Sequence, residues 1–249
     1  IPLRLVGSEM CIRDRLSTVI WTNFGLVFTL AKLLNLLNRK KTDLINRFSK
    51  DSCLLLIDAQ KGVDVLSHWG GKNGRRNNPD AESNMLGLLA EWRQAGLSVA
   101  WTLHDSREAD SPLKLSESGG ELKPGFEICD HDIVIEKDVN SGFIGTSLEI
   151  ILRRAGIQRL VVVGFFTNCC VETTVRMSGN MGFDTYLISD CCATTNRIGF
   201  DGTDYDPELV HSMAVANLHR EFCTALEVEQ ASSLLRENLV GIDRCQGNE

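Results

Sequence analysis

One stretch, residues 160–180 (LVVVGFFTNCCVETTVRMSGN), constrains the fold more than any other part of this chain. Its first residues are almost continuously apolar, which predicts a strand that is buried on both faces. Thr167 and Asn168 favour the start of a helix, and Cys169 and Cys170 open the helical segment that follows. This strand–turn–helix order is the arrangement of a nucleophile elbow, with cysteine in the place of serine.

A thiol at the start of that helix has a chemical advantage. Free backbone N–H groups and the helix dipole favour its anion, so we expect its pKa to fall toward the working range. The same N–H groups can hold a developing oxyanion. A cysteine can also be a small buried apolar residue. We interpret Cys169 in that simpler way and take Cys170 as the candidate nucleophile.

The rest of the chain alternates short apolar runs with helical patterns. Further strands are predicted at Cys53–Ile57, Leu97–Leu103, Ile133–Glu136, Thr185–Ser189 and Thr224–Val228. Helices are predicted from Asn78-Pro79 to Gly96, over Ser147–Ala155, from the elbow to Gly182, from Asp206-Pro207 through Leu218, and over Glu229–Asn238. Such alternation predicts an α/β fold, a three-layer α/β/α sandwich around a mostly parallel sheet of five or six strands.

The two ends of the chain are expected to differ from this domain, which we place at residues 51–240. Residues 1–15 carry no periodic pattern and look like translated adapter sequence, so we expect a non-native segment. Residues 16–50 predict an amphipathic helical extension that packs on the domain or on a partner subunit, with polar interruptions that make a membrane anchor unlikely. Residues 241–249 are expected to be a tail.

Charge and cysteine usage exclude several classes of function. The formal net charge is −7, which gives no support to a nucleic-acid partner. The nine cysteines are odd in number and none forms a C-x-x-C pair. This pattern argues against a disulfide framework or a zinc ribbon and favours reduced thiols in the cytoplasm.

Three chemically useful side chains fall at matching places in the predicted topology. Asp58, Lys137 and Cys170 each lie at or just past the carboxyl end of a predicted strand. In an open parallel sheet those ends line one edge, where ligands bind. The carboxylate can take the thiol proton, and the ammonium can stabilise the thiolate. Singly, the aspartate could cap a turn and the lysine could be solvated; jointly, their placement favours catalysis.

Four segments carry a resemblance to a known family: LLLIDAQ, HDSREADSPL, VIEKDVNSGFIGTSLE and VVVGFFTNCCVETTVRMSGNMGF. On these segments the chain, from about residue 53 to residue 235, resembles the isochorismatase-like cysteine hydrolase family. The resemblance implies an Asp–Lys–Cys triad at Asp58, Lys137 and Cys170, because the family's nucleophile directly precedes a valine. It also implies a cis peptide at Phe165–Phe166 and an oxyanion hole made by the backbone N–H groups of Phe166 and Cys170.

The reaction implied by the resemblance is hydrolysis of a C–N bond in a small amide or carbamoyl-like substrate, through a thioester and without a cofactor. Resemblance also implies a homodimer or homotetramer. Some family members hydrolyse the vinyl ether of isochorismate without a nucleophilic cysteine, and the presence of Cys170 argues against that chemistry. Two alternatives stay open: a non-catalytic binding member of the family, and a thiol redox sensor that uses Cys170 beside Cys169.

Candidate substrate contacts lie on loops at the same sheet edge. We expect Trp69, His104, Asn140 and Phe143 to form an aromatic and apolar pocket. The long irregular stretch 107–131 is expected to decide specificity or to form a lid. His68 lacks the D-x-H spacing of nicotinamidase-like metal sites, so no metal is expected.

Overall fold

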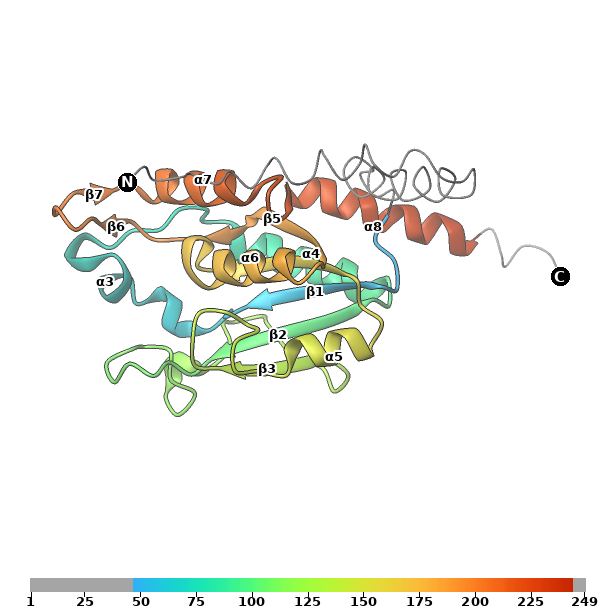
Figure 1. Cartoon of the computed structure of the whole chain (residues 1–249), viewed down its shortest axis with the longest axis horizontal. Helices are drawn as coiled ribbons and strands as arrows, with labels where there is room; N and C mark the ends of the chain where they lie inside the picture. The colour runs from blue at the N-terminus through green and yellow to red at the C-terminus, as the bar shows by residue number, and fades with distance from the viewer. Residues whose placement is uncertain (1–46, 244–249) are drawn as a thin grey trace, which may run out of the picture. The chain divides into compact units, whose positions relative to one another are not determined.

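The structure, a computed structural model, describes residues 47–243 of the chain. Its centre is a parallel sheet in the order β3–β2–β1–β4–β5–β8. The strands are β1 (Ser52–Ile57), β2 (Ser98–His104), β3 (Ile133–Lys137), β4 (Arg159–Phe165), β5 (Asp184–Ala193) and β8 (Thr224–Leu226). All six predicted strands are therefore present, and the predicted fold class is confirmed (Figure 1).

The centre of the sheet is as apolar as the sequence predicts. Every residue of β1 is buried, and β1 pairs with β2 on one side and with β4 on the other. Leu55 is the register partner of both Ala100 and Val162. Burial on both faces follows from helices that cover both sides of the sheet.

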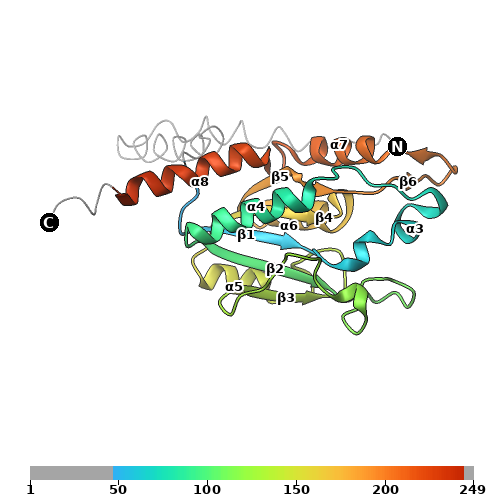
Figure 2. The same cartoon turned by 180° about the vertical axis from the view of Figure 1, so that it is seen from behind.

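The helices form two layers. On one face lie α4 (Ala81–Gln94) and α8 (Val228–Asp243), which contact each other and β5. On the other face lie α5 (Leu148–Arg154) and α6 (Glu172–Asn180), with α7 (Pro207–Leu218) against α6. Figure 1 shows α5 and α6 in front of the sheet, and Figure 2, from behind, shows α4 in front. None of the helices in residues 47–243 has the length and apolarity needed to cross a bilayer.

The start of the described chain differs from the predicted helical extension. Residues 47–49 are not helical. Phe48 is nevertheless fully buried, and its ring centroid lies 5.2 Å from that of Trp92 and 5.5 Å from that of Tyr186. The expectations for residues 1–46 and 244–249 lie outside the described residues, and the domain boundaries stay predictions.

Three local features were not predicted correctly. The helix predicted to start at Asn78-Pro79 begins at Ala81 instead, and the Asn78 side-chain amide donates to the Cys192 carbonyl at 2.6 Å and so ties this loop to β5. The elbow begins with a π-helical turn, η4 (Thr167–Val171), before α6. A short hairpin of β6 (Arg197–Ile198) and β7 (Asp204–Tyr205) precedes α7.

Candidate active site

Four strand ends bring the candidate residues together. Asp58 directly follows β1 and has a positive φ of 52°. Lys137 ends β3, and its register partner on β2 is His104. Cys170 lies in η4, directly after β4. Because these strands are parallel neighbours, their carboxyl ends deliver all four side chains to one edge of the sheet.

Asp58 and Lys137 form a buried ion pair. Lys137 Nζ donates to Asp58 Oδ2 at 2.7 Å, and both side chains are almost completely buried. Thr102 donates its hydroxyl to Asp58 Oδ1 at 2.6 Å, so both carboxylate oxygens are held. Burial alone would raise the pKa of Asp58, but the Lys137 ammonium beside it leaves that pKa below its usual value. The carboxyl group is therefore ionised at neutral pH.

The Lys137 ammonium is held in its charged form. Burial opposes the charge, but the Asp58 carboxylate and the nearby Cys170 sulfur leave the pKa of Lys137 above its usual value. Lys137 Nζ also lies 3.1 Å from His104 Nδ1 and 3.2 Å from the Val139 carbonyl oxygen. Two oxygen acceptors and one ring nitrogen thus surround a group that has three N–H donors.

Cys170 joins this cluster from the elbow. Its Sγ lies 3.6 Å from His104 Nδ1 and 3.8 Å from Asn140 Oδ1. Ligand atoms of Asp58, His104 and Cys170 all lie within 4.8 Å of one another. The structure therefore brings together the three residues that the sequence predicted and adds His104 among them.

The expected lowering of the thiol pKa is wrong for this structure. Burial and the adjacent Asp58 carboxylate raise the pKa of Cys170 well above its usual value, and the Lys137 ammonium offsets only part of this. The helix-start argument considered the N–H groups but not the carboxylate that would share the site. The resting arrangement is a protonated thiol beside an ionised carboxylate.

Two supporting residues were not predicted. Gln60 accepts a hydrogen bond from the His104 backbone N–H at 2.7 Å and donates to the His104 carbonyl at 3.1 Å, which fixes the end of β2. Its amide also donates to the Gly120 carbonyl at 3.1 Å. The second supporting residue is Thr102, which lies inside β2. A polar residue within an otherwise apolar strand was the available signal, but the sequence does not reveal which strand lies next to Asp58.

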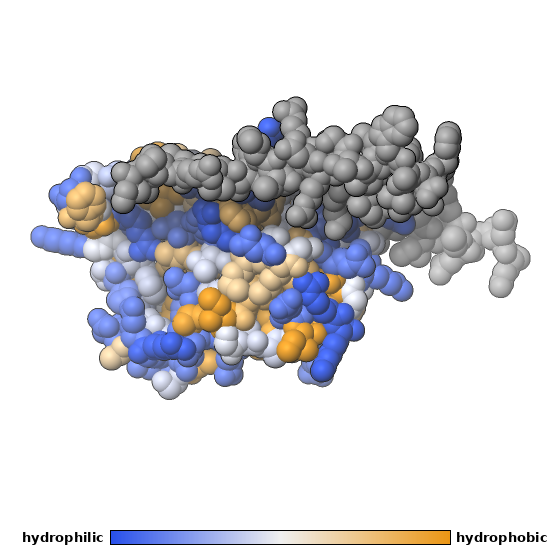
Figure 3. All heavy atoms as spheres, in the orientation of Figure 1, coloured by the Kyte–Doolittle hydropathy of each residue, from blue (hydrophilic) through white to orange (hydrophobic). Residues whose placement is uncertain are grey.

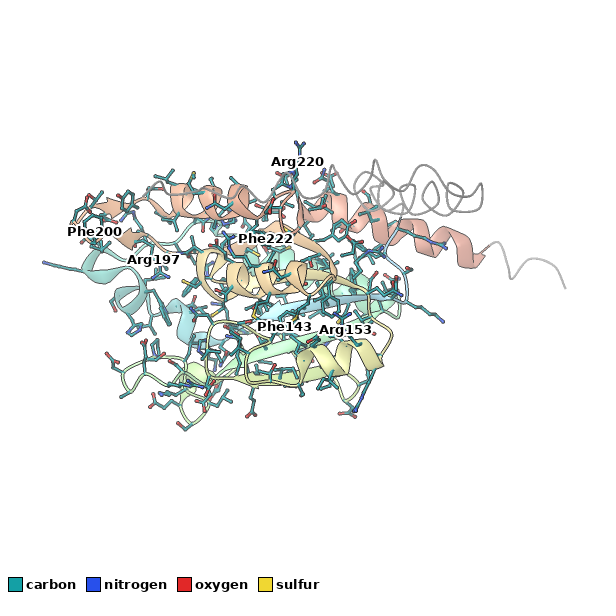
Figure 4. The ribbon with its side chains drawn as sticks, in the orientation of Figure 1. Phe143, Arg153, Arg197, Phe200, Arg220 and Phe222 are labelled. Carbon is teal, nitrogen blue, oxygen red and sulfur yellow. The ribbon has the colours of Figure 1, made fainter. Side chains whose placement is uncertain are left out.

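A pocket of about 500 Å³ borders the cluster at His104. Trp69, His104 and Asn140 lie in its lining, as predicted for substrate contacts, together with Ser106 and three residues of the long loop, Arg107, Glu108 and Ser111. Phe143, labelled in Figure 4, is not in this lining. It is buried in the core, where its ring stacks on that of Phe183.

The elbow shapes the inner wall of the site. The peptide bond between Phe165 and Phe166 is cis. The Phe166 ring packs edge-on against Trp69, with centroids 5.2 Å apart. Within the described chain, the Phe166 N–H donates no backbone hydrogen bond. An N–H group without an acceptor next to a nucleophile is the arrangement that an oxyanion hole needs.

The long loop is held against the chain that follows β1. The Lys123 N–H donates to the Ala59 carbonyl at 2.9 Å, and the Lys61 N–H donates to the Glu121 carbonyl at 2.8 Å. At Gly62 a β-carbon would lie 2.4 Å from the Pro112 carbonyl oxygen, so only glycine fits this close approach. The loop is thereby fixed at the mouth of the pocket.

The cluster also offers a ligand set for a metal ion. Asp58, His104 and Cys170 could supply one carboxylate oxygen, one imidazole nitrogen and one sulfur. Lys137 Nζ, however, lies within hydrogen-bond distance of both Asp58 and His104. The ammonium supplies the positive charge that a metal would bring, so a metal-free site stays our prediction.

Comparisons with known proteins identify the family. The isochorismatase domain model matches residues 52–230. The uncharacterized isochorismatase family protein YrdC of Bacillus subtilis is 40% identical over 177 residues, 71% of this chain and 92% of that protein. Ureidoacrylate amidohydrolase RutB of Acinetobacter baylyi is 37% identical over 112 residues, 41% of this chain and 46% of that protein.

A solved structure from Chromobacterium violaceum, described as an isochorismatase-family hydrolase, is 40% identical and has a TM-score of 0.72. The match covers 79% of this chain and all of that one. The family model, the sequence identity and the fold agree, and the chain belongs to the isochorismatase family of hydrolases.

Proposed function

We propose that this protein is a cysteine hydrolase that cleaves the C–N bond of a small amide or carbamoyl-like substrate through a thioester. The observation that carries the proposal is the convergence of Asp58, Lys137 and Cys170 in one buried cluster, next to a pocket that is lined by His104 and Asn140, the two residues in contact with Cys170 Sγ. RutB, named as an amidohydrolase, supports the same bond type.

The geometry fits a proton transfer that accompanies attack. Asp58 takes the proton from Cys170 as the sulfur bonds to the substrate carbonyl, and the Lys137 ammonium keeps the aspartate ionised until then. The high pKa of the resting thiol means that a free thiolate is not stored. The carbonyl oxygen, now negative, is held by the backbone N–H groups of Phe166 and Cys170.

The second half of the cycle reverses these roles. Asp58 returns its proton to the leaving nitrogen, the C–N bond breaks, and a thioester on Cys170 remains. A water molecule, deprotonated by Asp58, attacks the thioester and releases the acid and the free thiol. The sum is amide plus water to acid plus amine or ammonia. Trp69, His104 and Asn140 would position the substrate.

The proposal is tested by a screen of small amides and ureas with ammonia release as the readout. During turnover, intact mass spectrometry should find the acyl part of the substrate on the protein, and peptide mapping should place it on Cys170. Failure of every amide to release ammonia or to acylate the protein would favour the non-catalytic alternative. Reversible oxidation by peroxide without turnover would favour the redox sensor.

We propose a cytoplasmic location for this enzyme. The seven cysteines of the described chain are all free thiols, including the vicinal pairs Cys169-Cys170 and Cys191-Cys192. Free thiols persist in a reducing compartment.

We also propose that two copies associate through the face formed by the β6–β7 hairpin and α7. The Phe200 side chain is fully exposed and projects from the hairpin tip (Figure 4), at the end of the molecule where Figure 3 shows apolar atoms on the surface. Leu209 and Met213 on α7 are about half exposed. Glu208 is the one charged residue of α7 at neutral pH. Beside them lies an apolar hollow of about 440 Å³. A projecting ring and a hollow on one face allow symmetric pairing, in which the Phe200 ring of each copy enters the hollow of the other.

Sedimentation tests the association. The wild-type chain should sediment as a dimer or a larger even assembly, and Phe200→Asp with Met213→Asp should shift it to the monomer. Ile150→Asp, which changes an equally exposed apolar residue on α5, should leave the assembly unchanged. A monomeric wild type would contradict the proposal.

A further inference from the structure

The His104 ring lies next to three groups that differ as hydrogen-bond donors and acceptors: an ammonium, a carboxylate and a thiol. Its Nδ1 lies 3.1 Å from Lys137 Nζ, 3.4 Å from Asp58 Oδ2 and 3.6 Å from Cys170 Sγ. The ring is held by the β2 backbone, which Gln60 fixes on both sides of the residue. The position of Nδ1 is therefore set by the same cluster that performs the proposed reaction.

The contact with Lys137 decides which ring nitrogen carries the proton. An ammonium group has three N–H donors and no lone pair, so a neighbour at 3.1 Å must be an acceptor. A proton on Nδ1 would point at an N–H group of the lysine. Asp58 Oδ2, the competing partner of Nδ1, is farther away and already accepts from Lys137 at 2.7 Å. Nδ1 therefore accepts, and the proton lies on Nε2.

That tautomer gives the pocket a donor. His104 lies in the pocket lining, and no partner for Nε2 is found among residues 47–243. Arg107, a charged donor in the same lining, is already paired with Asp138 at 2.7 Å and is therefore not free to donate to the substrate. A single N–H of fixed direction, close to the nucleophile, can select for an acceptor oxygen on the substrate.

We propose that Lys137 fixes the Nε2–H tautomer of His104 and that this N–H selects substrates with a second acceptor oxygen, beyond the scissile carbonyl. The substrate class is then an amide that carries a second carbonyl or carboxylate oxygen near the scissile bond, rather than a simple alkyl amide. The proposal rests on the proposed hydrolase function for its substrate half, but the tautomer can be measured without any turnover. Lys137 thus keeps Asp58 ionised and also fixes the tautomer of the His104 ring.

Long-range ¹H–¹⁵N NMR of the full-length labelled protein tests the tautomer, because protonated and unprotonated ring nitrogens resonate far apart. The His104 signals are those lost in His104→Gln. In the wild type Nδ1 should be unprotonated, and in Lys137→Met the proton should shift toward Nδ1, which can then donate to Asp58. Lys123→Met, which changes another buried lysine, should leave the pattern unchanged. A protonated Nδ1 in the wild type would overturn the proposal.

Substrate selection is tested with malonamide, which has a second carbonyl, and butyramide, which does not. In Cys170→Ala protein, where no acylation can occur, saturating malonamide should shift the Nε2–H resonance of His104 and butyramide should not. In the active enzyme, His104→Asn should lower kcat/KM for malonamide roughly tenfold more than His104→Gln does, because only glutamine can place an N–H near the Nε2 position. Equal penalties on both amides, or no resonance shift with malonamide, would contradict the recognition role. An enzyme that binds malonamide in this way but hydrolyses no amide would refute the hydrolase proposal alone.

Discussion

Lys137 Nζ and Asp58 Oδ2 lie 2.7 Å apart although their strands are not neighbours in the sheet. β2 separates β1 from β3, and the lysine reaches across the end of β2 to the aspartate. Two residues of β2 contact the pair: Thr102 contacts Asp58, and His104 contacts Lys137. The ion pair therefore joins three strand ends and sets the charges around Cys170.

Loss of the lysine should destabilise the fold as well as the site. Lys137→Met leaves Asp58 buried without its counter-charge, which typically costs about 3–5 kcal/mol of unfolding free energy. Urea unfolding at neutral pH measures this loss. The double variant Asp58→Asn with Lys137→Met should recover much of the stability, because it removes the unpaired charge, but should remain inactive. If the single variant were as stable as the wild type, the pair would not be coupled as described.

Stability should depend on pH through Asp58. Its pKa in the folded state is below the ordinary value of 3.8, so folding gains stability from this group above pH 3.8 and loses it as pH falls below that value. Denaturant unfolding of the wild type and of Asp58→Asn should therefore differ most at neutral pH, and the difference should shrink below pH 3.8. If the difference in unfolding free energy between the two proteins stayed constant down to pH 2, the Asp58 carboxylate would not be its origin.

Cys170 should be a slow nucleophile toward small alkylating agents in the resting enzyme. Burial and the Asp58 carboxylate hold the pKa of its thiol high, so iodoacetamide should react slowly at pH 7 and faster as pH rises above 9. Asp58→Asn removes the negative neighbour, lowers that pKa and should speed alkylation at pH 8. Peptide mass spectrometry of Cys170 measures both rates. Slower alkylation in the variant would contradict the assigned cause.

Thr102 should act through the charge of Asp58. Thr102→Val removes the hydroxyl donor to Asp58 Oδ1, and a hydrogen bond to a charged group contributes about 1.5–3 kcal/mol. The pKa of Asp58 should rise, so the acid limb of the kcat/KM profile should move to higher pH. Thr185→Val, another buried threonine outside the cluster, should lower stability without moving that limb. An unmoved limb in Thr102→Val would contradict the role.

Chelation should not affect turnover. Lys137 Nζ lies within hydrogen-bond distance of Asp58 and His104, two of the three groups that could ligate a metal ion, and brings a positive charge there. Incubation with EDTA, followed by gel filtration, should therefore leave ammonia release unchanged. Activity lost on chelation and restored by added zinc would contradict the metal-free site.

The sequence was sufficient for the fold and for the three central residues because both depend on local pattern. Apolar runs that end in Asp58 and Lys137, and an elbow that ends in Cys170, specify strand ends without knowledge of the strand order. Parallel connections then bring those ends to one edge. The same reasoning placed Trp69, His104 and Asn140 at the pocket.

What the sequence could not supply depends on contacts between distant segments. The neighbour of Asp58 is Thr102 only because β2 lies beside β1 in the sheet. Phe143 faces the core, not the pocket, because the loop after β3 turns toward Phe183. The direction of the Cys170 pKa shift also depended on burial and on the distance to Asp58, neither of which a sequence pattern contains.

The most direct test of the central claim compares ammonia release by the wild type, Cys170→Ala and Cys169→Ala on one hydrolysed amide. If the sulfur of Cys170 forms the thioester, Cys170→Ala should lose activity by a factor on the order of a thousand or more, whereas Cys169→Ala should retain most of it. Turnover by Cys170→Ala at the wild-type rate would contradict the account.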